Sequence, residues 1–240
     1  MRFRMVSVAG VAAVCMGAPA VAGDATYSDG TFFSGHWTIL EIDVGNGGSH
    51  VITSPLSGGT PGQWRQIQST AANSPGPGRR SIIFSIHLFD NAIYDPSLEG
   101  PALEFTYSED SIAVSGARQA TGLALYQSGV YFIAPGLMTT ALTSWVHMAA
   151  TVAGADLVAI DPFDLDDGLN QSFHPDLSGT APPFQIGFYR SVQTALGGTG
   201  VTATAGIDNW RVHVMPAPGA SLVATFTLLM PLVTRRRRSS

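Results

Sequence analysis

The 240-residue sequence contains no lysine and a single cysteine, and only 12% of its residues are charged. All 12 basic residues are therefore arginines, and six of them lie at the two ends, at positions 2, 4 and 235–238. The remaining six arginines share the intervening chain with all 17 acidic residues, which predicts an acidic body. A surface without a basic stripe is a poor partner for phosphate backbones, so we do not expect nucleic-acid binding.

The single cysteine, Cys15, lies inside an apolar stretch near the N-terminus. If this stretch is removed, the mature chain has no thiol, which excludes disulfides, zinc–thiolate sites and cysteine nucleophiles. The chain also lacks Gly-x-Ser-x-Gly, so the nucleophile turn of α/β-hydrolases is not expected.

The N-terminus has the layout of a secretory signal. Arg2 and Arg4 precede an apolar stretch at 5–16, and Ala20-Val21-Ala22 supplies small residues at a cleavage site. We therefore predict a signal helix at 1–22 that is removed, leaving a body at 23–215.

The C-terminal segment, 216–240, combines a proline-rich turn, an apolar run at 221–233 and a cluster of arginines. The run is shorter than the roughly 20 residues that span a bilayer, so we expect a transient membrane contact during export, through a short hydrophobic helix. This three-part tail resembles the PEP-CTERM sorting signals of exported bacterial proteins, although Ala217 stands where that family has an acidic residue. The resemblance implies export and sorting machinery as partners. The residues that carry it are Pro216, Pro218, Gly219, Arg235, Arg236, Arg237 and Arg238.

The body lacks apolar residues at helical spacing and instead contains short runs of β-branched and aromatic residues between turn-forming clusters. This pattern predicts an all-β, two-sheet antiparallel β-sandwich of the jelly-roll type. The expected strands are 37–44, 49–53, 64–69, 81–89, 103–108, 111–115, 121–127, 130–134, 144–151, 184–189, 200–204 and 207–214. In the last strand, alternation predicts one face with Asp208, Trp210, Val212 and Val214 and another with Ile207, Asn209, Arg211 and His213.

The run Gly206-Ile207-Asp208-Asn209-Trp210-Arg211-Val212 resembles the closing strand of concanavalin-like and laminin-G-like jelly rolls. Three further segments, at 107–110, 174–177 and 184–190, resemble exported planctomycete-type proteins that combine such sandwiches with sorting tails. The resemblance implies a jelly-roll body located in the cell envelope, at the cell surface or outside the cell.

Leu40-Glu41-Ile42-Asp43-Val44 resembles a motif of laminarinase-like glycoside hydrolases, which share the jelly-roll fold. Glu41 and Asp43 would share one face of a strand, as a nucleophile and its helper. A retaining hydrolase needs a second carboxyl group about 5 Å away, and Gly45 and Asn46 stand where that family's second glutamate would follow. Catalysis by this pair is the alternative to a solvent-facing strand surface.

An acidic segment at 161–170 lies in an expected loop that extends to residue 181. Hard oxygen ligands suit Ca²⁺, although the spacing does not match an EF-hand loop. Calcium is the only cofactor that the sequence suggests, and the alternative is a solvated acidic loop. The candidate ligands are Asp161, Asp164, Asp166 and Asp167.

Four tryptophans offer a surface for stacking on sugars. Trp145 and Trp210 lie on alternating strands, so we expect both in the core. Trp37, Trp64 and Arg65 are the candidate ligand-binding residues, because Trp64 is followed directly by polar side chains that bind hydroxyls.

These features predict an exported, non-catalytic β-sandwich module that binds carbohydrate, such as an extracellular polysaccharide, or matrix. Two alternatives stay open: a glycan-active hydrolase that uses Glu41 and Asp43, and a structural surface protein without a ligand.

Overall fold

The structure is a computed structural model that describes residues 24–138 and 144–217, which belong to one compact unit spanning 21–219. The predicted signal helix at 1–22 and the apolar run and arginine cluster of the sorting segment lie outside the described residues. Among the described residues, no helix is long and apolar enough to cross a membrane.

The described chain is built from strands, with one short helix, α1 (Pro96–Glu99), and two turns of 3₁₀ helix (Ser34–His36 and Gly154–Asp156). The first strands are β1 (Ala25–Asp29), β2 (Trp37–Val44), β3 (Gly48–Thr53), β4 (Arg65–Ala71), β5 (Ile82–Tyr94), β6 (Ala102–Gly116) and β7 (Ala120–Gln127). The remaining strands are β8 (Val130–Ile133), β9 (Leu137–Met138), β10 (Val146–Ala153), β11 (Val158–Ile160), β12 (Leu169–Asn170), β13 (Phe184–Gln193) and β14 (Val201–Pro216).

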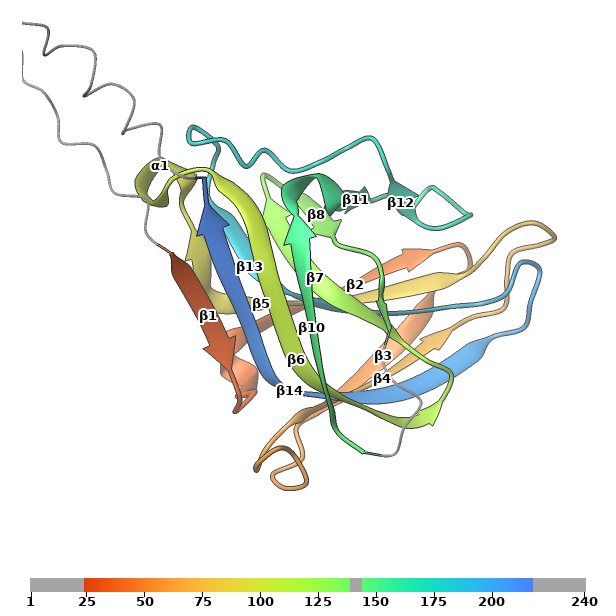
Figure 1. The fold of residues 1–240 in the computed structure, drawn as a ribbon. Coiled ribbons are helices and arrows are strands. Elements are labelled where there is room, and N and C mark those ends of the chain that lie inside the picture. Colours follow the sequence, from red (N-terminus) through yellow and green to blue (C-terminus); the bar gives the residue numbers. More distant parts are fainter. Residues whose placement is uncertain (1–23, 139–143, 218–240) are drawn as a thin grey trace, which may run out of the picture. The chain divides into compact units, whose positions relative to one another are not determined.

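The strands form two antiparallel sheets, which confirms the predicted β-sandwich (Figure 1). Sheet A has the order β10-β6-β14-β4-β3, with β1 also paired to β14. Sheet B has the order β12-β11-β8-β7-β13-β5-β2, with β9 also paired to β7. In Figure 1, β1 and β14 run side by side, so the first and last strands of the body are neighbours.

Most of the expected strands are present, and β2 has the predicted bounds. Two predicted breaks are absent, because 103–108 and 111–115 form the single strand β6, and 200–204 and 207–214 form the single strand β14. The strands β1, β9, β11 and β12 were not expected, and all four have at most five residues. Such short strands carry too little alternation to be recognised from sequence.

A bulge in β14 changes which face its residues occupy. Asn209 has a φ of 47°, and the register with β6 shifts between Asp208 and Arg211. Ile207 therefore packs in the core with Trp210, while Asp208 turns to the outer face of the sheet. The prediction that Asp208 shares a face with Trp210, and Ile207 a face with Arg211, was wrong, because an extra residue in a strand reverses the alternation beyond it.

The space between the sheets holds a large apolar core and, within it, a fully buried ion pair. Arg190 on β13 of sheet B donates to Glu109 on β6 of sheet A over 3.0 Å, and both side chains are completely buried. Tyr107 and Thr121 donate to the second carboxylate oxygen of Glu109. Arg190 also donates to the Gly206 carbonyl over 3.2 Å. The pair thus joins β6 of sheet A to β13 of sheet B in the interior of the sandwich.

A second buried cation lies on β4. The Arg65 guanidinium stacks over Phe32 and Trp37, with 5.1 Å to the indole centroid, and donates to Nδ1 of His87 over 3.1 Å. Burial lowers the pKa of Arg65 to about 10. Burial, reinforced by Arg65, also holds the pKa of His87 well below its usual value. His87 is therefore neutral and donates from Nε2 to Ser85.

Replacing Glu109 with Gln should lower the free energy of unfolding by about 3–5 kcal/mol, because it leaves the Arg190 charge buried without its counter-ion. Urea denaturation measures the change. Glu104→Gln is the matched control, since Glu104 lies on the opposite face of β6, and it should alter stability by at most about 0.5 kcal/mol. Equal effects of the two variants would contradict a central role for the pair.

Acidification should destabilise the fold before the carboxylates titrate. Below pH 6.5, an unfolded chain protonates this histidine, whereas folded His87, with its depressed pKa, does not. The unfolded state then binds more protons, so the free energy of unfolding falls by up to about 1.4 kcal/mol per pH unit as the pH drops. Denaturation curves at pH 7.5 to 5 measure this slope. His36→Gln, at an exposed position, should keep it, and His87→Gln should reduce it.

Candidate functional site

The outer face of sheet A carries a shallow groove with a volume of about 420 Å³. Its lining is mostly hydroxyl, imidazole and guanidinium groups, and we call it the polar groove. The polar groove is lined by Thr26, Thr106, Ser108, His147, Ala149, Arg211 and His213.

Strand register brings these side chains together from four adjacent strands. Ser108 on β6 lies opposite Ala149 on β10 and opposite Arg211 on β14. One row further along, Thr106 lies opposite His213, which in turn lies opposite Thr26 on β1. Alternate residues of a strand share a face, so all of these side chains point away from the core. The polar groove is therefore set by backbone pairing and not by loops.

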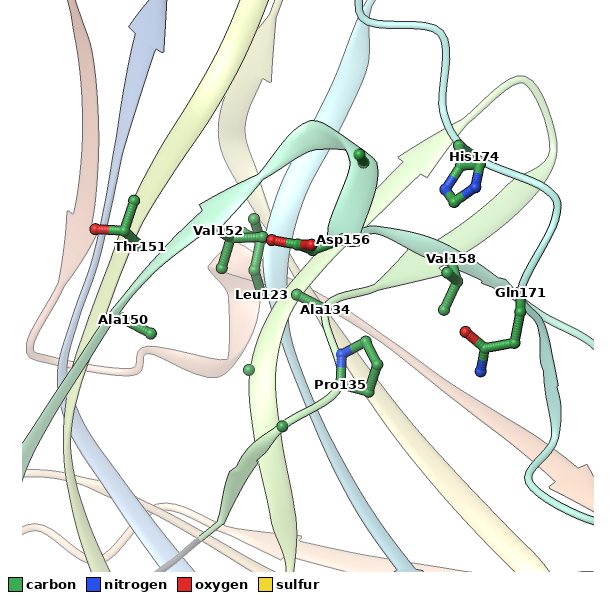
Figure 2. Close-up of a pocket in the computed structure, with 13 residues that line it drawn as sticks. Leu123, Ala134, Pro135, Ala150, Thr151, Val152, Asp156, Val158, Gln171 and His174 are labelled. Atoms are coloured by element: carbon green, nitrogen blue, oxygen red, sulfur yellow. The ribbon is translucent and has the colours of Figure 1, made fainter.

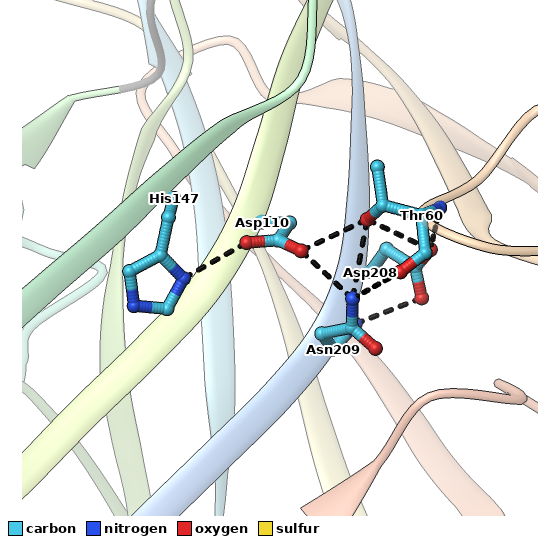
Figure 3. A network of polar contacts seen from close by, with 5 residues as sticks. All are labelled: Thr60, Asp110, His147, Asp208 and Asn209. Atoms are coloured by element: carbon cyan, nitrogen blue, oxygen red, sulfur yellow. Dashed lines mark hydrogen bonds and ion pairs between the residues drawn. The ribbon is translucent and has the colours of Figure 1, made fainter.

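A hydrogen-bonded network adjoins the polar groove (Figure 3). Asp110 is its centre: it accepts from Asn209 over 2.7 Å and from the Thr60 hydroxyl over 2.8 Å, and it contacts His147 over 2.8 Å. Asp208 accepts hydrogen bonds from the backbone N–H and the hydroxyl of Thr60. Burial raises the pKa of Asp110, but the hydrogen bonds from Asn209, His147 and Thr60 outweigh it and bring the pKa below its usual value. The network fastens the loop that contains Thr60 to the sheet.

Beside this network lie two half-buried tryptophans, Trp64 and Trp145, which we call the tryptophan pair. Their rings meet edge to face, with 5.3 Å between centroids and an angle of 85°. Both indole N–H groups donate to loop carbonyls, from Trp64 to Ser57 over 3.0 Å and from Trp145 to Gly58 over 2.7 Å. The orientation of both rings is therefore fixed by the loop between β3 and β4.

Gly206 makes room for the tryptophan pair. A Cβ atom at this position would lie 2.5 Å from the ring of Trp64, closer than packing permits. The glycine of the Gly-Ile-Asp-Asn run thus has a physical role, because it lets an indole lie directly on β14.

The structure separates the three residues that we expected to bind a ligand. Trp37 is 5% exposed and Arg65 is 0% exposed, so both belong to the core. Trp64 is half-buried at the surface, so it is the one residue of the three whose side chain can contact a ligand. Trp210 is in the core as expected, whereas Trp145 is half-exposed beside Trp64.

Glu41 and Asp43 lie on the same face of β2, which is an edge strand of sheet B. Glu41 lies 2.8 Å from Nδ1 of His50 on β3, the edge strand of sheet A, and accepts from the backbone N–H of the same histidine. Burial, together with the nearby charge of Glu41, raises the pKa of Asp43. The contacts of Glu41 thus connect the edges of the two sheets, and neither carboxylate lines a groove described here.

The acidic loop at 161–170 uses its carboxylates on its own backbone. Asp161 accepts from the N–H of Phe163, Asp164 from that of Asp166, and Asp167 from that of Leu169. Within the described residues, no group of three or more acidic, histidine or cysteine side chains is placed to hold a metal ion.

A cleft of about 500 Å³ opens where the edge strand β10 of sheet A faces β7 of sheet B (Figure 2). Its polar side chains support the surrounding loops: Asp156 accepts from the backbone of Ala153, and His174 donates from Nδ1 to the carbonyl of Leu157. The described residues that line this cleft include no Trp, Tyr or Phe, so they offer no surface for ring stacking. Its apolar lining includes Leu123, Ala134, Pro135, Ala150, Val152 and Val158.

No protein-family model matches the sequence, and a comparison with curated proteins finds no match. Several solved structures of low similarity are carbohydrate-binding modules. A family 11 module from Clostridium thermocellum, in complex with a β-1,3-1,4-mixed-linked tetrasaccharide, is 12% identical over 82% of this chain and 98% of its own, with a TM-score of 0.46. A xylan-binding family 22 module from Paenibacillus barcinonensis is 11% identical over 83% and 99%, with a TM-score of 0.40.

Adding calcium at millimolar concentration should leave the melting temperature unchanged, because three of the four candidate carboxylates, those of Asp161, Asp164 and Asp167, already accept from backbone N–H groups. A ligand that binds only the folded state would raise it. Differential scanning calorimetry with calcium, and with a chelator as the control, measures the shift. A rise that disappears in Asp164→Asn would instead show that the loop rearranges to bind the ion.

Proposed function

We propose that the protein is an exported, non-catalytic carbohydrate-binding module whose site is the outer face of sheet A. The observation that carries this proposal is the tryptophan pair, fixed by hydrogen bonds and adjoining the polar groove across the Asp110 network.

A sugar ring has an apolar face of C–H groups and a rim of hydroxyls. A half-exposed indole covers the apolar face, and its large rigid area costs little conformational entropy on binding. The hydroxyls need partners that both donate and accept, and the polar groove supplies them from Thr106, Ser108 and His147. Burying a hydroxyl without a partner costs free energy, so this mixture of groups favours polyols over apolar ligands.

The site is also rigid before any ligand arrives. Its side chains stand on paired strands, and the loop that holds both indoles is fastened through Thr60 to Asp110 and Asp208. Rigid sites lose less entropy on binding, which raises affinity.

Hydrolysis at Glu41 and Asp43 receives less support. Glu41 is bonded to His50 at the edge of the sandwich. A retaining mechanism needs two carboxyl groups that converge on one bond of a bound substrate. Export is supported by the sequence pattern of the two ends, which lie outside the described residues.

Replacing Trp64 or Trp145 with Ala should weaken glycan binding by about 2 kcal/mol, or roughly 30-fold, because each change removes a stacking surface. A glycan array identifies a ligand, and isothermal titration calorimetry measures its affinity for the full chain and the variants. Phe163→Ala is the matched control, since Phe163 is an 89% exposed aromatic residue on the 161–170 loop. It should leave affinity unchanged. The proposal fails if the array retains no glycan, or if the tryptophan variants bind like the unmodified protein.

A further inference from the structure

We infer that the polar groove selects anionic polysaccharides, whose carboxylates pair with Arg211. This inference rests on the proposed function and names the class of glycan that the same site takes. It is carried by the distribution of charge around the groove.

The polar groove concentrates basic side chains on an otherwise acidic body. Among the described residues, two of the six arginines, Arg65 and Arg190, are buried in the core. Arg211 is exposed and lies in the groove between His147 and His213. None of the seven lining residues is acidic. A carboxylate that enters the groove therefore meets one guanidinium and two imidazoles, and the carboxylates nearest to them, Asp110 and Asp24, lie outside the lining.

The two histidines already have counter-groups outside the lining. His147 contacts Asp110 over 2.8 Å, and His213 lies 3.9 Å from Asp24 and 3.0 Å from the Thr26 hydroxyl. Arg211 differs from both, because within the described part of the chain its guanidinium has no ion pair or hydrogen bond. It is thus the cation that remains available to a ligand.

The surroundings of Arg211 suit a sugar acid. Arg211 lies opposite Ser108 on one side and opposite Ser28 on the other, so hydroxyl groups flank the guanidinium in the same row. A guanidinium binds a carboxylate through two parallel hydrogen bonds, with a geometry that neutral hydroxyls do not match. A uronate residue carries its carboxylate beside ring hydroxyls, and the groove presents complementary groups in that arrangement.

The Asp110 network determines which ring nitrogen of His147, the histidine beside Arg211, carries a proton. Asp110 only accepts when it is ionised, so His147 donates to it from Nδ1. In neutral His147 the other ring nitrogen, Nε2, is then an acceptor for a ligand hydroxyl. The site therefore combines one cation for the acid group with acceptors and donors for the rest of the ring.

The test compares two forms of one polymer, polygalacturonate and its methyl ester, which differ in charge and share a backbone. Alginate is a second anionic probe, and mixed-linkage β-glucan is a neutral one. The full chain should bind polygalacturonate or alginate at least tenfold more tightly than the ester, and 0.5 M NaCl should weaken that binding. Arg211→Gln should reduce affinity for the anionic polymer about tenfold or more and leave binding of the ester within twofold.

Arg79→Gln is the matched control, because Arg79 is an exposed arginine outside the groove lining, and the variant should bind like the unmodified chain. Equal affinity for the acid and ester forms, or binding to the β-glucan alone, would overturn the inference. In either of these two cases, the proposed function would still stand if Trp64→Ala abolished the glycan binding that is observed. Binding to none of these glycans and to no glycan on the array would overturn both. Intact folding of each variant is checked by its melting temperature.

Discussion

The buried ion pair between Arg190 and Glu109 is the constraint on which the rest of the sandwich depends. Two charges removed from water are tolerated only when each satisfies the other and additional hydrogen bonds complete their shells. Here, Tyr107 and Thr121 donate to Glu109, and Arg190 donates to the Gly206 carbonyl and the Ser111 hydroxyl, which leaves only Nε of Arg190 without a partner among the described residues. Because Glu109 belongs to β6 and Arg190 to β13, this requirement fixes the position of one sheet over the other. Apolar packing alone tolerates more sliding.

That position determines the outer face of sheet A. Glu109 must point inward, so its neighbours Ser108 and Asp110 must point outward, where they supply the polar groove and its network. On β14, the bulge at Asn209 lets Ile207 and Trp210 both face the core. It also turns Asp208 outward, so that two carboxylates on adjacent strands secure Thr60 and the loop of the tryptophan pair. Core and site are thus two faces of the same strands.

The sequence was sufficient for the fold class and for most strands, because alternation and turn residues are local signals. Prediction from the sequence failed where contacts between residues far apart in the chain determine the structure. The run Ser108-Glu109-Asp110 resembled a turn in composition, yet it lies within β6 because Arg190, 81 residues away, satisfies the glutamate. Arg65 was predicted to bind a ligand, but in the structure it is enclosed by Phe32, Trp37 and His87. Trp64 is the one residue of the candidate site that was anticipated. Asp110, His147 and Arg211 meet only through strand register.

The pairing of the first and last strands has a mechanical consequence. Ala25 lies opposite Val214, and Asp29 lies opposite Trp210, so the start of β1 pairs with the last part of β14 at one end of an antiparallel ladder. Tension applied to those two ends would break the hydrogen-bonded residue pairs of β1 and β14 one after another. It would not load all of the pairs together in shear. A body tethered at one end while holding a polymer would resist pulling better than one stretched between both ends. Its attachment geometry would then govern how much force it withstands.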